Sequence, residues 1–166
     1  MKLTFAGNEM NLVGEQVKVG DVAPDFVAVK GDLSEYHLSD DKGKVVIISV
    51  VPSIDTGVCA IQTRTFNEDA TELSKDIKIV TISMDLPFAQ QRFCAAEGIE
   101  QVELVSDYKD HDFANKYGYL IKELGLLARG IIIVDREGKV TYTEIVPEVT
   151  HEVNFDAALE EAKKLI

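Results

Sequence analysis

The stretch VVIISVVPSIDTGVC, residues 45–59, sets the architecture of this chain, because a strongly apolar run ends at a proline and is followed by a cysteine where the next helix should begin. A continuous run of β-branched residues is typical of a strand buried on both faces between layers of helices. The N–H groups and the positive dipole end of a helix start favour the thiolate form of a cysteine placed there. The stretch therefore predicts an α/β fold with a reactive thiol, Cys59, at a strand-to-helix junction.

The rest of the chain repeats this alternation of apolar runs and helical patterns. The residues 135–138, DREG, predict a turn between two antiparallel strands, and Pro87 suits the first turn of a helix, where its missing N–H costs nothing. The order β-α-β-α-β-β-α predicts a thioredoxin-like fold, an α/β sandwich with a central mixed sheet flanked by helices. Strands are predicted at 45–51, 78–83, 131–135 and 139–146, and helices at 59–75, 87–97, 112–118 and 154–166.

The N-terminal part is predicted to precede this core as an extension. The first twelve residues alternate around Gly7 and Asn8, which predicts a β-hairpin with these two residues in its turn. An extended polar arm follows, in which Pro24 restricts the residue before it to extended backbone. With no internal repeat or linker, residues 1–166 are predicted to form a single domain.

Composition excludes several classes of partner. The formal net charge of −12 would repel nucleic-acid phosphates and anionic membrane surfaces. The apolar runs reach only strand length and the first residues do not read as a signal peptide, so we expect no membrane association and a cytoplasmic location. The two cysteines are too far apart for a C-x-x-C pair, which excludes a thioredoxin-type dithiol. The three histidines are scattered as well, so we expect no metal site and no cofactor.

Residues around Cys59 fit the needs of a thiolate that attacks an O–O bond, which requires hydrogen-bond donors for the displaced oxygen and protection from bulk water. The Thr56 hydroxyl should reach the sulfur or an oxygen beside it, and Gly57 permits a tight turn that would leave the N–H groups of Val58 and Cys59 facing that oxygen. Pro52 would form a rigid apolar wall. Taken singly, Thr56 fits a plain helix N-cap and Pro52 a plain strand terminator equally well.

The segment lacks a cation, and Arg129 in LLARGIIIVD is the predicted supplier. It stands directly before a core strand, where parallel-sheet geometry would bring its guanidinium near the strand end that carries Pro52. A planar, permanently charged donor suits both a thiolate and a peroxide oxygen. The alternative for Arg129 is a surface residue at a strand mouth. Arg64 is the second candidate and reads more readily as a solvated helix residue.

Two motifs together carry a family resemblance. PSIDTGVC, residues 52–59, fits the P-x-x-x-[TS]-x-x-C pattern of peroxiredoxins, and DLPFAQQRFC, residues 85–94, closely resembles the signature of their bacterial thiol peroxidase branch, the atypical two-cysteine type. The resemblance extends from the N-terminal hairpin through GDVAPDF, residues 20–26, to the LLAR segment and the last helix.

The resemblance implies a function and a set of site residues. Cys59 would be the peroxidatic cysteine and Cys94 the resolving cysteine, with Thr56, Pro52 and Arg129 completing the pocket. Hydrogen peroxide or an organic hydroperoxide would be reduced, the sulfenic acid on Cys59 would condense with Cys94 into an intrachain disulfide, and thioredoxin would reduce that disulfide. Members of the family are usually homodimers.

Two alternatives use the same thiol differently. A cysteine hydrolase needs a histidine base held by a third group, and His37, His111 and His151 stand in polar surroundings outside any such motif. A redox sensor or thioredoxin-like binding module, switched by the Cys59–Cys94 disulfide, is compatible with the sequence and differs from an enzyme in stopping after one equivalent of peroxide.

Overall fold

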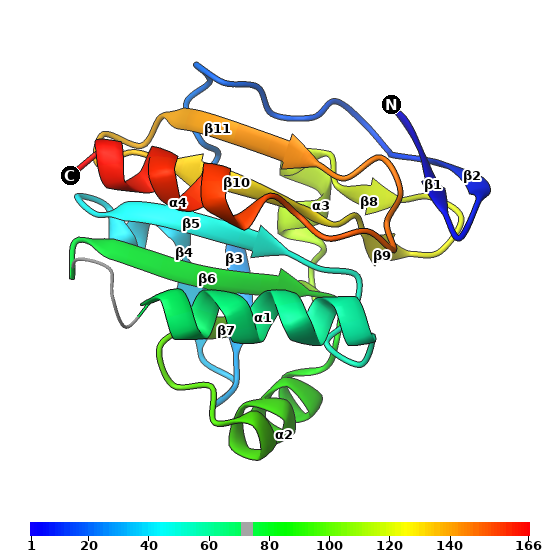
Figure 1. Cartoon of the computed structure of the whole chain (residues 1–166), viewed down its shortest axis with the longest axis horizontal. Coiled ribbons are helices and arrows are strands. Elements are labelled where there is room, and N and C mark those ends of the chain that lie inside the picture. The colour runs from blue at the N-terminus through cyan, green and yellow to red at the C-terminus, as the bar shows by residue number, and fades with distance from the viewer. Residues whose placement is uncertain (71–74) are drawn as a thin grey trace.

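The computed structural model describes residues 1–70 and 75–166. Within this part of the chain, seven strands form a mixed sheet in the order β11-β10-β5-β6-β7-β3-β4 (Figure 1). The strands β5, β6 and β7 are parallel, and β10 runs antiparallel to both β5 and β11. The bounds are β3 Val27–Lys30, β4 Glu35–His37, β5 Val45–Val50, β6 Ile77–Ser83, β7 Glu103–Ser106, β10 Gly130–Val134 and β11 Val140–Ile145.

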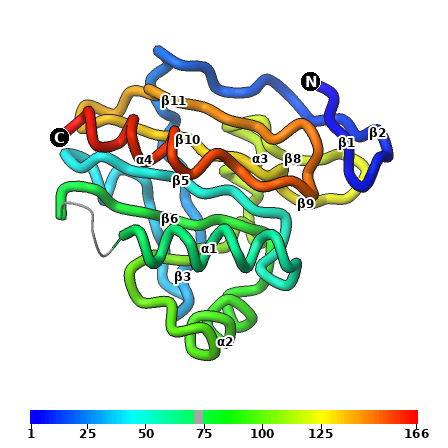
Figure 2. The backbone as a smooth tube through the Cα atoms, viewed as in Figure 1, coloured from blue at the N-terminus to red at the C-terminus, as the bar shows by residue number. Residues whose placement is uncertain are grey.

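Helices cover both faces of this sheet (Figures 1 and 2). The helices α1 and α4 lie on one face and α3 on the other, while α2 packs beside β7 below α1 in the view of Figure 1. A short 3₁₀ helix, η1, follows β4. Two small hairpins lie outside the central sheet, one of β1 and β2 and one of β8 and β9. Their bounds are α1 Gly57–Ala70, α2 Pro87–Glu97, α3 Asp112–Tyr117, α4 Phe155–Lys164, η1 Leu38–Asp41, β1 Lys2–Phe5, β2 Asn8–Asn11, β8 Leu120–Ile121 and β9 Leu126–Leu127.

The central strands are apolar throughout because each of their faces is covered. In β5, Val45 and Ile47 join the core under α1 and α4, whereas Val46, Ile48 and Val50 join the core on the α3 side. This alternation follows from the two-residue period of a strand. The core under α1 and α4 also contains Phe66 from α1 and Ala158 from α4. The core on the α3 side contains aromatic rings such as the stacked pair Phe113 and Tyr117.

The structure agrees with the predicted alternation of elements and corrects four details. β7, between α2 and α3, was not predicted, and residues of the supposed arm form β3 and β4 of the central sheet. The N-terminal hairpin turns at Ala6 and Gly7, both with positive φ, and Asn8 already belongs to β2.

The first helix also begins earlier than predicted, at Gly57, because its cap is Thr56. Its predicted continuation over 71–74 lies outside the described residues, and Lys75 is in a turn.

Candidate active site

Cys59 occupies the third position of α1 and is fully buried. Its backbone N–H donates to the Thr56 hydroxyl at 3.2 Å, and that hydroxyl donates to the carbonyl of Ser53 at 3.3 Å. Thr56 is therefore an N-cap in this state of the protein. The prediction that the Cys59 N–H faces an incoming oxygen is wrong, because the cap already uses it. What the helix start provides to the sulfur is its dipole and a fixed position.

Arg129 holds the sulfur of Cys59 directly. Its Nη2 donates to Cys59 Sγ at 3.1 Å, although these residues lie 70 positions apart. The first residue of β10, Gly130, pairs with Val50 at the end of β5, so Arg129 stands beside the segment that leads into α1. The predicted neighbourhood is thus observed, but the predicted reason is wrong. Antiparallel pairing of β10 and β5 places the start of one strand next to the end of the other, which parallel pairing would not do.

The guanidinium of Arg129 is itself fixed on its other sides. Nε donates to the carbonyl of Val149 at 2.7 Å and Nη1 to Gln62 Oε1 at 3.0 Å, and the residue is only 2% exposed. Gln62 is buried and donates in turn to the Ser49 hydroxyl at 2.8 Å. A buried charge that is hydrogen-bonded at all three nitrogens has little freedom to turn away from the sulfur. The site therefore presents a rigid cationic donor to Cys59.

A pocket of about 170 Å³ opens onto this arrangement. Arg129 forms its polar wall and Pro52, which is buried, an apolar one. The hairpin β1–β2 contributes Phe5, so four separate parts of the chain enclose the pocket. The remaining lining comes from Thr56, Gly57, Val58, Val149 and Thr150. The pocket has the composition expected for a small polar group carried on an apolar tail.

Cys94 lies in a different environment, in the last turn of α2. It is half-buried and packs against the core under α1 and α4, and both cysteines are free thiols. Burial raises the pKa of the Cys94 thiol, so Cys94 stays protonated at neutral pH. A protonated thiol is a poor nucleophile.

The structure thus brings together Cys59, Thr56, Pro52 and Arg129 and keeps Cys94 on a neighbouring helix. Sequence reasoning missed Gln62, although a signal was present. Cys59, Gln62, Thr63 and Phe66 form the buried stripe of α1, and a glutamine in such a stripe indicates a buried polar contact.

The other polar candidates lie elsewhere. Arg64 is part-exposed and pairs with Glu97 of α2 at 3.2 Å. In the described residues no histidine bonds to Cys59, and no group of three or more metal-ligating side chains is found there. No helix of the described chain is long and apolar enough to cross a membrane.

The chain is similar in sequence to known proteins over nearly its whole length. The family model described as Redoxin matches residues 18–159. The chain is 53% identical over 165 residues to the thiol peroxidase of Bacillus subtilis strain 168, covering 99% of this chain and 98% of that protein. It is 52% identical to the thiol peroxidase of Oceanobacillus iheyensis over 162 residues, which is 98% of each chain.

Solved structures show the same fold. A peroxiredoxin-like protein from Aquifex aeolicus superposes with a TM-score of 0.94 at 42% identity, covering 99% of this chain and 97% of that one. The thiol peroxidase from Chromobacterium violaceum superposes with a TM-score of 0.87 at 20% identity, over 99% of this chain and 96% of that one, and shares the fold.

Proposed function

Because this chain belongs to the redoxin family, and is within it a thiol peroxidase of the peroxiredoxin type, we propose that Cys59 is the peroxidatic cysteine and Cys94 the resolving cysteine of its catalytic cycle. The observation that carries the assignment is the donation from Arg129 Nη2 to the buried Cys59 Sγ at the start of α1. Cys94, the second cysteine of the chain, lies on another helix and is a free thiol, which suits the second role.

The first step is the attack of the Cys59 thiolate on the terminal oxygen of a peroxide. The S–O bond forms as the O–O bond breaks, the cysteine becomes a sulfenic acid, and the other oxygen leaves as an alkoxide or hydroxide that takes up a proton. Arg129 lines the pocket and touches the sulfur, so one guanidinium serves the nucleophile and the charge that develops on oxygen. Pro52 and Phe5 exclude water from the reacting atoms.

The pocket supports a choice among peroxides. Its lining is largely apolar, with Phe5, Val58 and Val149 around Arg129. An alkyl group attached to the peroxide would bury apolar surface there, whereas hydrogen peroxide would not. We expect both hydrogen peroxide and organic hydroperoxides to react, the organic ones more efficiently.

The second step closes the cycle. The sulfur of Cys94 attacks that of the oxidised Cys59, the S–O bond breaks, and the hydroxyl group leaves with the thiol proton as water. A thioredoxin-type reductant then returns both cysteines to thiols. We propose thioredoxin as that reductant and a homodimer of one-domain chains as the working form.

Exchange of each cysteine for serine tests the assignment. Cys59→Ser should abolish peroxide reduction, since a hydroxyl lacks the acidity and nucleophilicity of a thiol. Cys94→Ser should consume one equivalent of peroxide, leave a sulfenic acid that dimedone traps, and lose most thioredoxin-supported turnover in a coupled NADPH assay. Wild-type turnover by the Cys94 variant would contradict the resolving role. If the unaltered chain stopped after one equivalent in the presence of reductant, it would act as a sensor.

A further inference from the structure

A continuous polar network joins the turn before Cys59 to the helix that carries Cys94, and Asp85 is its centre. One carboxylate oxygen of Asp85 accepts from the Ser53 hydroxyl at 2.7 Å, and the other accepts from the backbone N–H of Ile54 at 2.8 Å. The same second oxygen accepts from the Ser83 hydroxyl at 2.6 Å. Three donors from two chain segments thus converge on one half-buried carboxylate.

From Asp85 the network reaches both cysteine helices. On one side, the carbonyl of Ser53 accepts from the Thr56 hydroxyl, which caps the N–H of Cys59. On the other side, the Ser83 hydroxyl accepts from Gln90 Nε2 at 3.0 Å. Gln90 is buried and stands one helical turn before Cys94 on α2, and it also donates to the carbonyl of Val105 in β7 at 2.8 Å.

Disulfide formation conflicts with this arrangement. Cys59 is fully buried against Arg129, and Cys94 is in the last turn of a separate helix. A disulfide requires the two Cα atoms to lie within about 7 Å and the Cβ atoms to point at each other. At least one of three segments, the turn 53–56, the first turn of α1 or α2, has to move for this. Asp85 bonds the turn directly. It is connected to α1 only through Thr56 and to α2 only through Ser83 and Gln90.

We propose that Asp85 is a positioning residue, which with Ser53, Ser83 and Gln90 forms a latch that holds the peroxide-reactive arrangement and has to open before Cys94 condenses with Cys59. The proposal rests on the assignment of these cysteines as resolving and peroxidatic. Opening is a local event, because the latch lies at the ends of β5 and β6 and leaves their ladder untouched. The latch sets how long the sulfenic acid on Cys59 survives, and therefore how often a second peroxide converts it to sulfinic acid.

Rapid quenching followed by mass spectrometry separates the two chemical steps. In Asp85→Asn, we expect disulfide formation to be several-fold faster and the sulfinic fraction at high peroxide to be lower than in wild type. The reaction of Cys59 with peroxide, measured in the Cys94→Ser background, should be slower, because the turn that caps Cys59 is less firmly held. Ser53→Ala removes one donor of the latch and should change the rate of disulfide formation, the sulfinic fraction and the peroxide reaction in the same directions, but to a smaller extent. Asp55→Asn, which removes an exposed carboxylate from the same turn, is the matched control.

A stability measurement distinguishes a latch from a merely structural residue. The latch exists only in the reduced chain, so Asp85→Asn should lower the Tm of the reduced protein and leave that of the oxidised protein unchanged. An equal fall of Tm in both forms, or disulfide formation that is unchanged or slower in Asp85→Asn, would overturn the proposal. If the wild-type chain formed no Cys59–Cys94 disulfide at all, the assignment of the cysteines would fail instead.

Discussion

At the scale of single residues, the proposed chemistry of this protein depends on how one buried arginine, Arg129, is held. Arg129 donates to a sulfur, a carbonyl and an amide oxygen, each from a different element. A lysine has the charge but not the planar arrangement of donors. The position of the charge is therefore fixed as strictly as that of the sulfur.

Replacement of Arg129 should slow the peroxide step far more than it changes substrate access. For Arg129→Gln, we expect the second-order rate of Cys59 oxidation to fall by about 100-fold or more, the usual effect of removing a donor to developing charge. Arg129→Lys should regain part of this rate. Stopped-flow measurement of the folded variants gives the second-order rate of Cys59 oxidation. Arg64→Gln, on the same helix as Cys59, is the control. A rate for Arg129→Gln within a factor of about two of wild type would remove Arg129 from the reaction.

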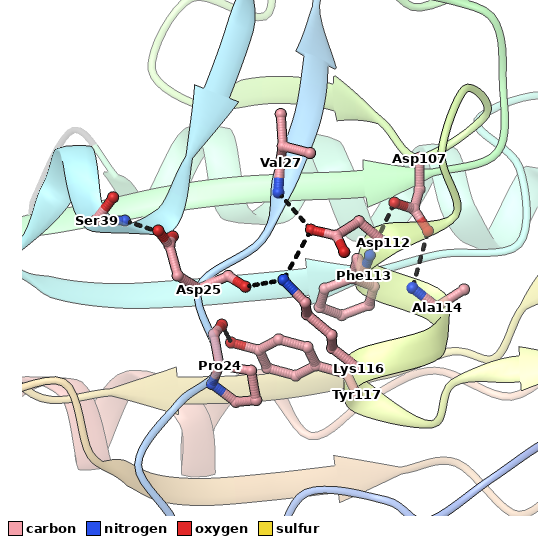
Figure 3. A network of polar contacts seen from close by, with 10 residues as sticks. All are labelled: Pro24, Asp25, Val27, Ser39, Asp107, Asp112, Phe113, Ala114, Lys116 and Tyr117. Atoms are coloured by element: carbon pink, nitrogen blue, oxygen red, sulfur yellow. Dashed lines mark hydrogen bonds and ion pairs between the residues drawn. The ribbon is translucent and has the colours of Figure 1, made fainter.

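Asp107 is a second residue whose burial has a measurable effect. It is 2% exposed, and its carboxylate accepts from the N–H groups of Phe113 and Ala114 at the start of α3 (Figure 3). Burial raises its pKa to about 6, against the smaller lowering effect of these bonds and of His111. A carboxyl with a pKa higher in the folded than in the unfolded chain takes up a proton on folding. Its contribution to stability is present below about pH 4 and lost as the pH rises to about 6.

Asp107→Asn should remove this dependence. Between pH 3.5 and pH 7, the unfolding free energy of the variant relative to wild type should rise by roughly 2 to 3 kcal/mol, since the amide does not titrate. Any loss of packing or hydrogen bonding in the variant is an offset that does not vary with pH. Urea unfolding at several pH values measures the slope. A difference that stays constant over this range would show that Asp107 is already ionised at pH 4.

How much of the site the sequence predicts depends on how local each contact is. Thr56 lies one helical turn from Cys59, so motif spacing is enough to place it. Arg129 can be predicted from its position before a core strand. The face of the sheet on which it lies follows from the two-residue period of a strand, because Ile131 and Ile133 belong to the core under α1 and α4. Gln62 and Asp85 bond to residues that are distant in the sequence and come near only in the folded chain. No local sequence pattern predicts these contacts.

At the scale of elements, one carboxylate fixes the turn of the hairpin β1–β2, whose strands are also joined to the rest of the fold through backbone hydrogen bonds of Thr4 and Asn11. Glu148 accepts from the backbone N–H groups of Ala6 and Gly7 in the turn and from the Thr4 hydroxyl. Hydrogen bonds from the N–H and hydroxyl of Thr150, together with those from the N–H groups of Gly7 and Ala6, lower the pKa of Glu148 to about 2. The contribution of Glu148 to this attachment is therefore complete above about pH 4.5 and is lost only as the pH falls toward 2. Through Phe5, the same hairpin forms a wall of the pocket.

Glu148→Gln should therefore change substrate preference more than chemistry. A neutral amide accepts fewer and weaker hydrogen bonds, so the hairpin and Phe5 should be less firmly placed. We expect the rate with a bulky alkyl hydroperoxide to fall several-fold and the rate with hydrogen peroxide to change little. Glu9→Gln, on the exposed side of β2 where it pairs with Lys2, is the control. Equal losses with both peroxides would show that Glu148 acts on Cys59 and not on the pocket wall.

The strands that the sequence misses share a physical cause. β7 has four residues and begins with a glutamate that pairs with Lys78, so its apolar run is too short to stand out. β3 and β4 lie toward one edge of the sheet, where polar residues are tolerated. The long runs of β5, β6 and β10 are recognisable because both of their faces are buried, but their composition does not reveal that β10 is antiparallel.

At the scale of the whole molecule, oxidation should redistribute stability without unfolding the core. A disulfide between Cys59 and Cys94 would restrict the unfolded chain by roughly 3 to 4 kcal/mol in the loop-entropy model, which offsets lost helical contacts. We expect faster hydrogen exchange in residues 56–62 and 87–97 of the oxidised protein and unchanged protection in β5, β6 and β10. On a non-reducing gel it should run as a monomer. A disulfide-linked dimer would contradict intrachain resolution.

The pairing of Cys59 with an arginine 70 positions later also has a consequence for biosynthesis. At about 5 to 20 residues per second, a ribosome adds Arg129 roughly 4 to 14 seconds after Cys59. Val149, which orients the guanidinium, follows later still. Throughout this interval the nascent cysteine is an ordinary thiol with no cationic partner. The growing chain is thereby spared rapid oxidation at the residue that we propose reacts with peroxide in the folded protein. A ribosome-stalled chain ending before residue 129 should react with peroxide no faster than a free cysteine.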